Sequence, residues 1–136
     1  MTSQIATQAE GLDRPEDLTL DRRALAALGR ADGGVVPAFV AALIGQYIEE
    51  AGTQVEELRE AGQRLDARAV KAIAHALRGS STLLGARRLG ALCAQLERGA
   101  GQPGFTRPEA LLSDLDQEFV KVRYALRAEL QGAGER

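Results

Sequence analysis

The sequence predicts an all-α protein that folds as an antiparallel up-down four-helix bundle with a short additional N-terminal helix. Alanine and leucine are abundant, whereas aromatic residues make up only 4% of the chain, and this balance favours helices over strands. Apolar residues recur three and four positions apart, and no segment shows the alternation typical of strands. Short loops separate the four long amphipathic segments, which should therefore pack antiparallel.

The first two helices are marked by residues that begin or interrupt helices. The short first helix is expected to begin after Asp21, as its N-cap, and to end near Gly29. The pair Gly33-Gly34 then interrupts the chain. Pro37 falls in the first turn of the long second helix, where its missing N–H costs nothing. The apolar stripe of the second helix consists of Val40, Leu43, Ile44, Tyr47, Ala51, Val55 and Leu58.

Three further helices complete the predicted bundle. The third is expected to begin after the N-cap Asp66 and to end near Gly85, a residue suited to a left-handed cap. The fourth covers residues 86–98, and a glycine- and proline-containing loop follows. The last helix is expected to begin after Thr106, which forms a capping box with Glu109 and places Pro108 in the first turn. Its apolar stripe consists of Leu111, Leu112, Leu115, Phe119, Val122, Leu126 and Leu130.

The chain length of 136 residues suits one domain with one hydrophobic core. Residues 1–17 are polar and show no sustained period, so we expect them to form a flexible N-terminal tail. Residues 18–131 should form the helical bundle domain. Residues 132–136, which include two glycines, are expected to form a C-terminal tail.

Composition excludes several classes of function. The net charge of −2 provides no field strong enough to bind nucleic acid. Cys93 is the only cysteine, which excludes an internal disulfide and a zinc site built on several thiolates. The longest apolar stretch, residues 35–45, is too short to span a membrane, and the N-terminus lacks the order of a secretory signal. We therefore expect a cytoplasmic protein.

His75 is the only histidine and is expected to point away from the core. On a helix that advances about 100° per residue, Val70, Ala74 and Leu77 share one face, and His75 lies roughly 155° from the centre of that face. This geometry argues against a buried structural histidine. It leaves open an idle surface histidine, because position on a helix says nothing about use.

The neighbours of His75 indicate that its face is used. Gly79 lies one turn later on the same face, and a glycine inside a helix costs about 1 kcal/mol relative to alanine. Such a cost is consistent with a need for open access to the imidazole. Lys71 and Arg78 flank this face and could bind an anion. A smooth strip that could receive a partner lies beside the histidine and consists of Ala72, Ala76 and Leu83.

The run from His75 to Glu97 resembles the histidine-containing phosphotransfer (HPt) domain family. The family pattern is His-x-Leu-Lys-Gly-Ser-Ser, then Leu-Gly-Ala, then leucines, a cysteine and Leu-Glu. Arg78 stands where the family usually has lysine, which keeps the charge but replaces a point charge with a planar fork. The resemblance extends more loosely over residues 18–130. The matched positions are His75, Leu77, Gly79, Ser80, Ser81, Leu84, Gly85, Ala86, Leu89, Cys93, Leu96 and Glu97.

The resemblance implies that His75 accepts a phosphoryl group from a receiver-domain aspartate or a hybrid histidine kinase and passes it to a response regulator. The chain would then be a phosphorelay intermediate rather than an enzyme, with Arg78 and Lys71 stabilising the phosphoryl group. It would bind no metal or other cofactor, because Mg²⁺ belongs to the partner receiver domain. Its partners would be receiver domains and sensor or hybrid histidine kinases, and it would act as a monomer.

The expected nucleophile is Nε2 of His75, with Nδ1–H held by a hydrogen bond that sets the tautomer. Glu97, on the adjoining antiparallel helix, is the candidate acceptor. One alternative is a non-catalytic helical adaptor that binds receiver or kinase domains without phosphoryl exchange. A metal-binding bundle is a third class, but it needs Glu-x-x-His pairs from facing helices, which one histidine cannot supply.

Overall fold

The computed structural model describes residues 19–29 and 38–135, and every regular element within those ranges is a helix. The predicted all-α class is therefore confirmed. The expected N-terminal tail, the Gly33-Gly34 break and Pro37 lie outside the described residues. The helices are α2 (Arg22–Gly29), α3 (Ala38–Gln63), α4 (Ala67–Leu83), α5 (Arg87–Ala100) and α6 (Glu109–Glu135).

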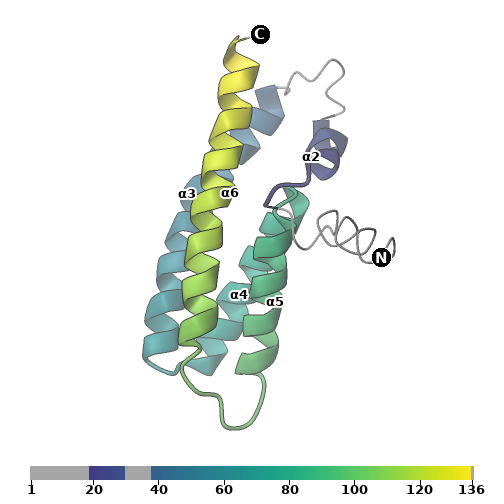
Figure 1. Cartoon of the computed structure of the whole chain (residues 1–136). Helices are drawn as coiled ribbons and strands as arrows, with labels where there is room; N and C mark the ends of the chain where they lie inside the picture. Colours follow the sequence, from purple (N-terminus) through teal and green to yellow (C-terminus); the bar gives the residue numbers. More distant parts are fainter. Residues whose placement is uncertain (1–18, 30–37, 136) are drawn as a thin grey trace, which may run out of the picture.

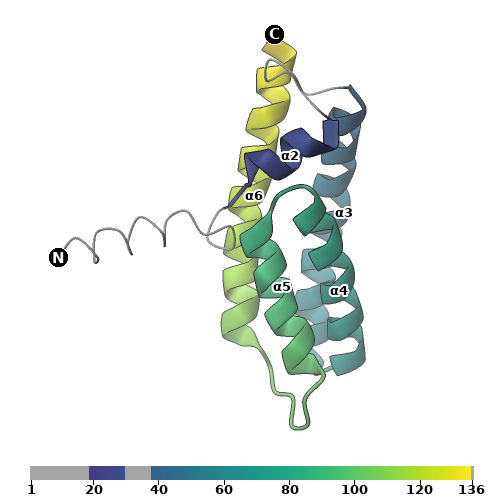
Figure 2. The ribbon, with the colours of Figure 1, turned by 90° about the vertical axis from the view of Figure 1, so that its right-hand side faces the viewer.

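Helices α3 to α6 form the predicted antiparallel bundle. Each packs against two neighbours: α4 lies between α3 and α5, and α6 packs on both α5 and α3 (Figure 1). The pair α3 and α6 extends past the turn that joins α4 to α5. The short helix α2 lies across this end of the bundle, next to that turn (Figure 2). None of the helices in the described residues combines the length and hydropathy that a membrane span requires.

One residue of the predicted core stripe of α3 faces solvent. The other six members of the stripe are buried, but the side chain of Leu43 is 40% exposed. At about 100° per residue, Leu43 lies roughly 80° from the centre of the face that the buried members share. It therefore borders the core instead of entering it. The six buried members are Val40, Ile44, Tyr47, Ala51, Val55 and Leu58.

The ends of α4 are set by the two residues that the sequence indicated. Asp66 is its N-cap, and its carboxylate accepts a hydrogen bond from the Ala69 amide at 3.1 Å. Gly85 follows the helix with φ at +88°, a conformation that favours glycine. A side chain at Gly85 would also begin 2.5 Å from the Asp21 carbonyl oxygen. The turn between α4 and α5 therefore requires glycine for both its backbone angle and its close contact.

The two ends of α6 differ from the prediction by a few residues. The helix begins at Glu109 and not directly after Thr106, so Pro108 precedes the first turn instead of lying in it. The Pro108 carbonyl accepts a hydrogen bond from the Leu112 amide at 2.9 Å. At the other end α6 continues through Glu135, so residues 132–135 are helical rather than part of a C-terminal tail. A glycine costs a helix about 1 kcal/mol, which weakens the helix without ending it. The two glycines in this segment were therefore insufficient grounds for a boundary at 131.

Asp21 joins α2 to the turn between α4 and α5. Its carboxylate accepts a hydrogen bond from the Arg23 amide at 3.0 Å, as expected for an N-cap, and another from Arg87 Nε at 2.7 Å. The Asp21 amide donates to the Gly85 carbonyl at 2.7 Å. Leu25 of α2 is buried in the core. These contacts fix α2 at the end of α4 that carries Leu83.

Replacing Asp21 with alanine is expected to destabilise the protein by about 1–2 kcal/mol, because both the helix cap and a partly buried ion pair are lost. The hydrogen bond from Arg87 lowers the pKa of Asp21 below its ordinary value of 3.8. This stabilisation is present above pH 3.8 and is lost as the pH falls through the lower pKa of the folded state. Thermal unfolding of the wild type and of Asp21→Ala, from neutral pH to below pH 3.8, measures the effect.

Asp114→Ala is the matched control, because Asp114 is an exposed carboxylate of α6. It should unfold like the wild type at every pH. The account of the Asp21 contacts is wrong if Asp21→Ala matches this control at neutral pH. It is equally wrong if the difference in stability between Asp21→Ala and wild type is the same well below pH 3.8 as at neutral pH.

Candidate functional site

His75 lies in the middle of α4 on the face opposite the core. The buried residues of this helix are Val70, Ala74, Leu77 and Ser81, whereas the His75 side chain is 65% exposed. The outward orientation predicted from helical geometry is therefore confirmed. A core histidine is excluded, and the ring is accessible to another protein.

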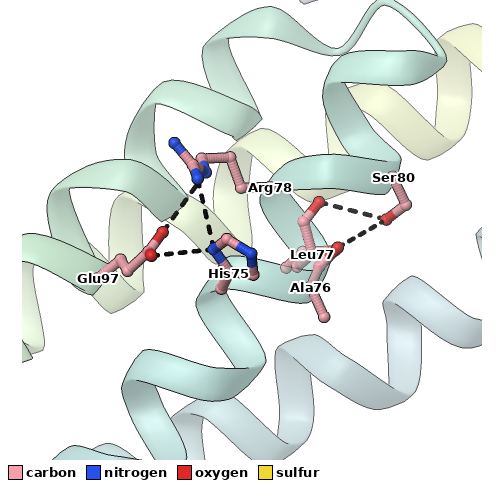
Figure 3. Close-up of polar contacts among 6 residues, drawn as sticks. All are labelled: His75, Ala76, Leu77, Arg78, Ser80 and Glu97. Carbon is pink, nitrogen blue, oxygen red and sulfur yellow. Dashed lines mark hydrogen bonds and ion pairs between the residues drawn. The ribbon is translucent and has the colours of Figure 1, made fainter.

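Glu97 of α5 holds one nitrogen of the imidazole ring. The distance from His75 Nδ1 to Glu97 Oε2 is 3.0 Å, so the proximity expected from the sequence is present (Figure 3). An ionised carboxylate only accepts hydrogen bonds, so this contact requires the proton of the neutral ring to be on Nδ1. The unprotonated nitrogen is then Nε2, which points away from Glu97 in Figure 3. This arrangement presents a free lone pair to solvent.

Arg78 lies beside the same carboxylate, one turn after His75. Its Nε is 3.4 Å from Glu97 Oε1, and its Nη2 is 3.3 Å from His75 Nδ1. Because guanidinium and Nδ1–H are both donors, the favourable contact of Arg78 is with Glu97. That oxygen is buried and has no hydrogen-bond partner among the described residues, so its polar contact is the ion pair with Arg78. The structure therefore places the guanidinium on the Nδ1 side of the ring, and not at Nε2.

Gly79 leaves an open space beside the ring, as the sequence indicated. A β-carbon added at Gly79 would meet no atom within 4 Å. A shallow hollow opens at this point, and its lining includes Arg78, Thr82 and Leu83 as well as His75 and Gly79. A glycine that neither packs closely nor adopts an unusual backbone angle has no structural need for its small size. The hollow is consistent with access to the histidine.

The apolar strip beside His75 extends further than predicted. Ala72 and Ala76 are exposed, and the side chain of Leu83 is 56% exposed. On α3, Leu43 and Phe39 are also exposed, and a second hollow between α3 and α4 is lined by both Leu43 and Leu83. The α3 part was missed because Leu43 was assigned to the core and Phe39 was not singled out. The exposed apolar surface thus covers two helices.

Lys71 lies on the other side of Arg78, in a hollow between α4 and the end of α5. This hollow is lined by Lys71, Arg78, Glu97 and Arg98, among others. The ammonium of Lys71 is 3.9 Å from the point where a side chain at Gly101 would begin. Lys71 does not line the hollow beside Gly79. Arg98, which the sequence analysis did not single out, belongs to the same hollow as Lys71.

Close packing of α4 and α5 sets the register that brings Glu97 to His75. A β-carbon at Gly90 would lie 2.6 Å from Thr82 Oγ1, so any larger residue would require Thr82 or the helix to shift. Glu97 follows Gly90 by two helical turns, and His75 precedes Thr82 by two turns. In an antiparallel pair these two residues must then meet. Sequence reasoning missed Gly90, because helix-interior glycine alone does not reveal what it approaches.

Two buried polar groups lie beneath the site. Tyr47 Oη and Ser81 Oγ share a hydrogen bond of 2.7 Å that joins α3 to α4. Burial raises the pKa of Tyr47 far above its ordinary value. Burial also raises the pKa of Cys93 to about 12, which keeps this thiol protonated and unreactive.

In the described residues no three His, Cys, Asp or Glu side chains are grouped so as to hold a metal ion.

Comparisons with known proteins agree with this geometry. The sequence model of the Hpt domain matches residues 42–133, well over half of the chain. The structure is similar to the crystal structure of histidine-containing phosphotransfer protein B (HptB) from Pseudomonas aeruginosa PAO1, with a TM-score of 0.74 and 29% sequence identity. The matched region covers 83% of this chain and 95% of that one. A search of curated proteins found no match.

Proposed function

The chain belongs to the Hpt domain family, whose members are phosphotransfer proteins of phosphorelays, and from this premise we propose that His75 is its phosphoacceptor. His75 receives a phosphoryl group from a receiver-domain aspartate or a hybrid histidine kinase and passes it to a response regulator. The observation that carries the proposal is the exposed imidazole whose Nδ1 is bound by Glu97, which leaves the Nε2 lone pair free.

The transfer step follows from this tautomer. The Nε2 lone pair attacks phosphorus of the aspartyl phosphate, and the bond from phosphorus to the aspartate oxygen breaks. The aspartate leaves as a carboxylate with the bonding electron pair. The new Nε2–P bond makes the ring positive while Nδ1 keeps its proton, and the Glu97 carboxylate at 3.0 Å stabilises this charge. The reverse sequence of steps returns the phosphoryl group to an aspartate.

The remaining residues provide access and contact. The hollow beside Gly79 admits the donor aspartate, and the apolar surface of Ala72, Ala76 and Leu83 receives the receiver domain in the cytoplasm. Mg²⁺ and the acidic pocket are supplied by that domain. Arg78 lines the hollow beside Gly79 and that side chain is 42% exposed. We therefore propose that Arg78 turns towards the phosphoryl oxygens after transfer, since guanidinium groups bind such oxygens by paired hydrogen bonds.

A phosphotransfer profile tests the proposal. The full chain is mixed, with Mg²⁺, with each phosphorylated receiver domain of the source organism, and label on the chain is measured over time. We expect rapid labelling from a few receiver domains and return of the label to unphosphorylated ones. A chain that binds receiver domains but never acquires label would be a non-catalytic adaptor, and the proposal would be wrong.

Glu97→Ala is expected to slow labelling by roughly tenfold or more, because hydrogen bonds to charged groups contribute about 1.5–3 kcal/mol. Glu97→Gln should be less impaired, since its amide oxygen can still accept a hydrogen bond from Nδ1. Nitrogen NMR of the imidazole provides a second measurement. Because His75 is the only histidine, the fraction of rings protonated at Nδ1 can be read directly, and it should fall in Glu97→Ala.

The matched control is Glu57→Ala, which removes an exposed carboxylate of α3. This control should label like the wild type and keep the wild-type tautomer. Equal labelling rates and equal tautomer fractions in Glu97→Ala and Glu57→Ala would remove Glu97 from the mechanism.

A further inference from the structure

A basic hollow lies next to His75 on the side of α5. Its charged lining consists of the cations Lys71, Arg78 and Arg98 and the single carboxylate Glu97. Glu97 is already engaged by His75 Nδ1 and by Arg78. Lys71 and Arg98 form no ion pair with any of the described residues of the chain. Two cations therefore remain available at one place beside the phosphoacceptor.

The charge of this hollow contrasts with that of the chain as a whole. The net charge is −2, and the exposed side of α3 carries a series of carboxylates. A local excess of positive charge on an acidic protein gives a docking partner a preferred orientation, because complementary potentials steer association. The exposed acidic residues of α3 are Glu49, Glu50, Glu56, Glu57 and Glu60.

The hollow is separate from the place where the phosphoryl group would be held. Glu97 binds Nδ1, so the phosphoryl group would be attached to Nε2 on the far side of the ring (Figure 3). The hollow beside Gly79 is lined by His75 and Arg78, among others, but by neither Lys71 nor Arg98. A ligand of these two cations would therefore be a different anionic group.

We propose that Lys71 and Arg98 form an anion subsite for an acidic side chain of the receiver domain that docks on His75. This inference rests on the proposed function and assigns part of its partner recognition. It gives Lys71 a role different from the phosphoryl stabilisation expected from the sequence. The subsite lies on one side of the ring and the apolar surface of Ala72, Ala76 and Leu83 on the other. Together they fix how the receiver domain approaches Nε2.

The double variant Lys71→Gln/Arg98→Gln tests the subsite. The matched control, Lys121→Gln/Arg127→Gln, removes two exposed cations of α6 and changes the net charge equally. Initial labelling rates are measured against the concentration of the phosphorylated receiver domain that labels the wild type fastest, at low and at high salt. Circular dichroism checks that each variant is folded, and calorimetric titration with the unphosphorylated domain measures binding apart from transfer.

We expect the half-saturating concentration to rise about tenfold at low salt in the Lys71/Arg98 variant, with an unchanged maximal rate. The difference should shrink at high salt, since exposed charges are screened. An unchanged half-saturating concentration, or the same rise in the α6 control, would overturn the subsite. A fall in the maximal rate alone would indicate that Lys71 stabilises the phosphoryl group, and it would also overturn the subsite.

Calorimetry distinguishes failure of the subsite proposal from failure of the proposed function. Failure of the wild type to acquire any label would contradict the proposed function. In that case calorimetry uses the receiver domain that binds the wild type most tightly. Weaker binding of this domain to the Lys71/Arg98 variant than to the control would still support the subsite, and equal binding would refute it.

Discussion

His75→Gln is expected to abolish labelling by phosphorylated receiver domains while leaving the bundle folded. Glutamine keeps a polar side chain on this face of α4 but has no lone pair that can attack phosphorus. The His75 side chain is 65% exposed, so its replacement should change the free energy of unfolding by no more than about 0.5 kcal/mol. Labelling assays with Mg²⁺ and thermal unfolding measure the two effects.

Lys121→Gln is the control for His75→Gln, because it introduces the same residue on the exposed side of α6. This control should label at the wild-type rate. Label that persists in His75→Gln would show that another residue accepts the phosphoryl group. Loss of label together with loss of the helical fold would give no support to a chemical role for the imidazole, and Glu97→Ala would then provide the independent test.

Gly79→Leu is expected to slow phosphoryl transfer by about 100-fold, because the new side chain would fill the hollow beside the ring and displace the donor from its attack geometry. Gly79→Ala should have a smaller effect on transfer and should stabilise the helix by about 1 kcal/mol. The alanine methyl meets no atom within 4 Å, so the gain is not offset by strain. Glycine at position 79 would then lower the stability of the helix while keeping the ring accessible.

The control for Gly79 is Gly99, another helical glycine at which an added β-carbon meets nothing within 4 Å. Gly99→Leu should be folded and should label like the wild type. If Gly79→Leu labels as fast as Gly99→Leu, the hollow beside His75 has no part in access. Unfolding measurements on both variants show whether slow transfer reflects lost stability instead.

Features that depend on residues near one another in the chain could be predicted from the sequence. The N-caps Asp21 and Asp66 and the left-handed Gly85 each act within a few residues, so their chemistry marks the helix boundaries. The outward direction of His75 likewise follows from the apolar residues of its own helix. The approach of Glu97 to His75 was predictable from their position on adjoining antiparallel helices.

Features that depend on how helices fit together could not be predicted. The close approach at Gly90 and the ion pair between Asp21 and Arg87 join residues from different helices, and no local pattern specifies them. The exposure of Leu43 depends on which neighbour covers the edge of a stripe. Arg98 gains its place beside Lys71 only from the packing of α4 on α5.

Phosphorus and nitrogen NMR of the phosphorylated, nitrogen-labelled chain test the central claim most directly. The chain has a single histidine, so the imidazole signals are unambiguous. We predict one phosphorus nucleus bonded to Nε2 of His75, with the proton retained on Nδ1. Phosphorus bonded to Nδ1 or to a side-chain oxygen, or a chain that no receiver domain phosphorylates, would contradict the account.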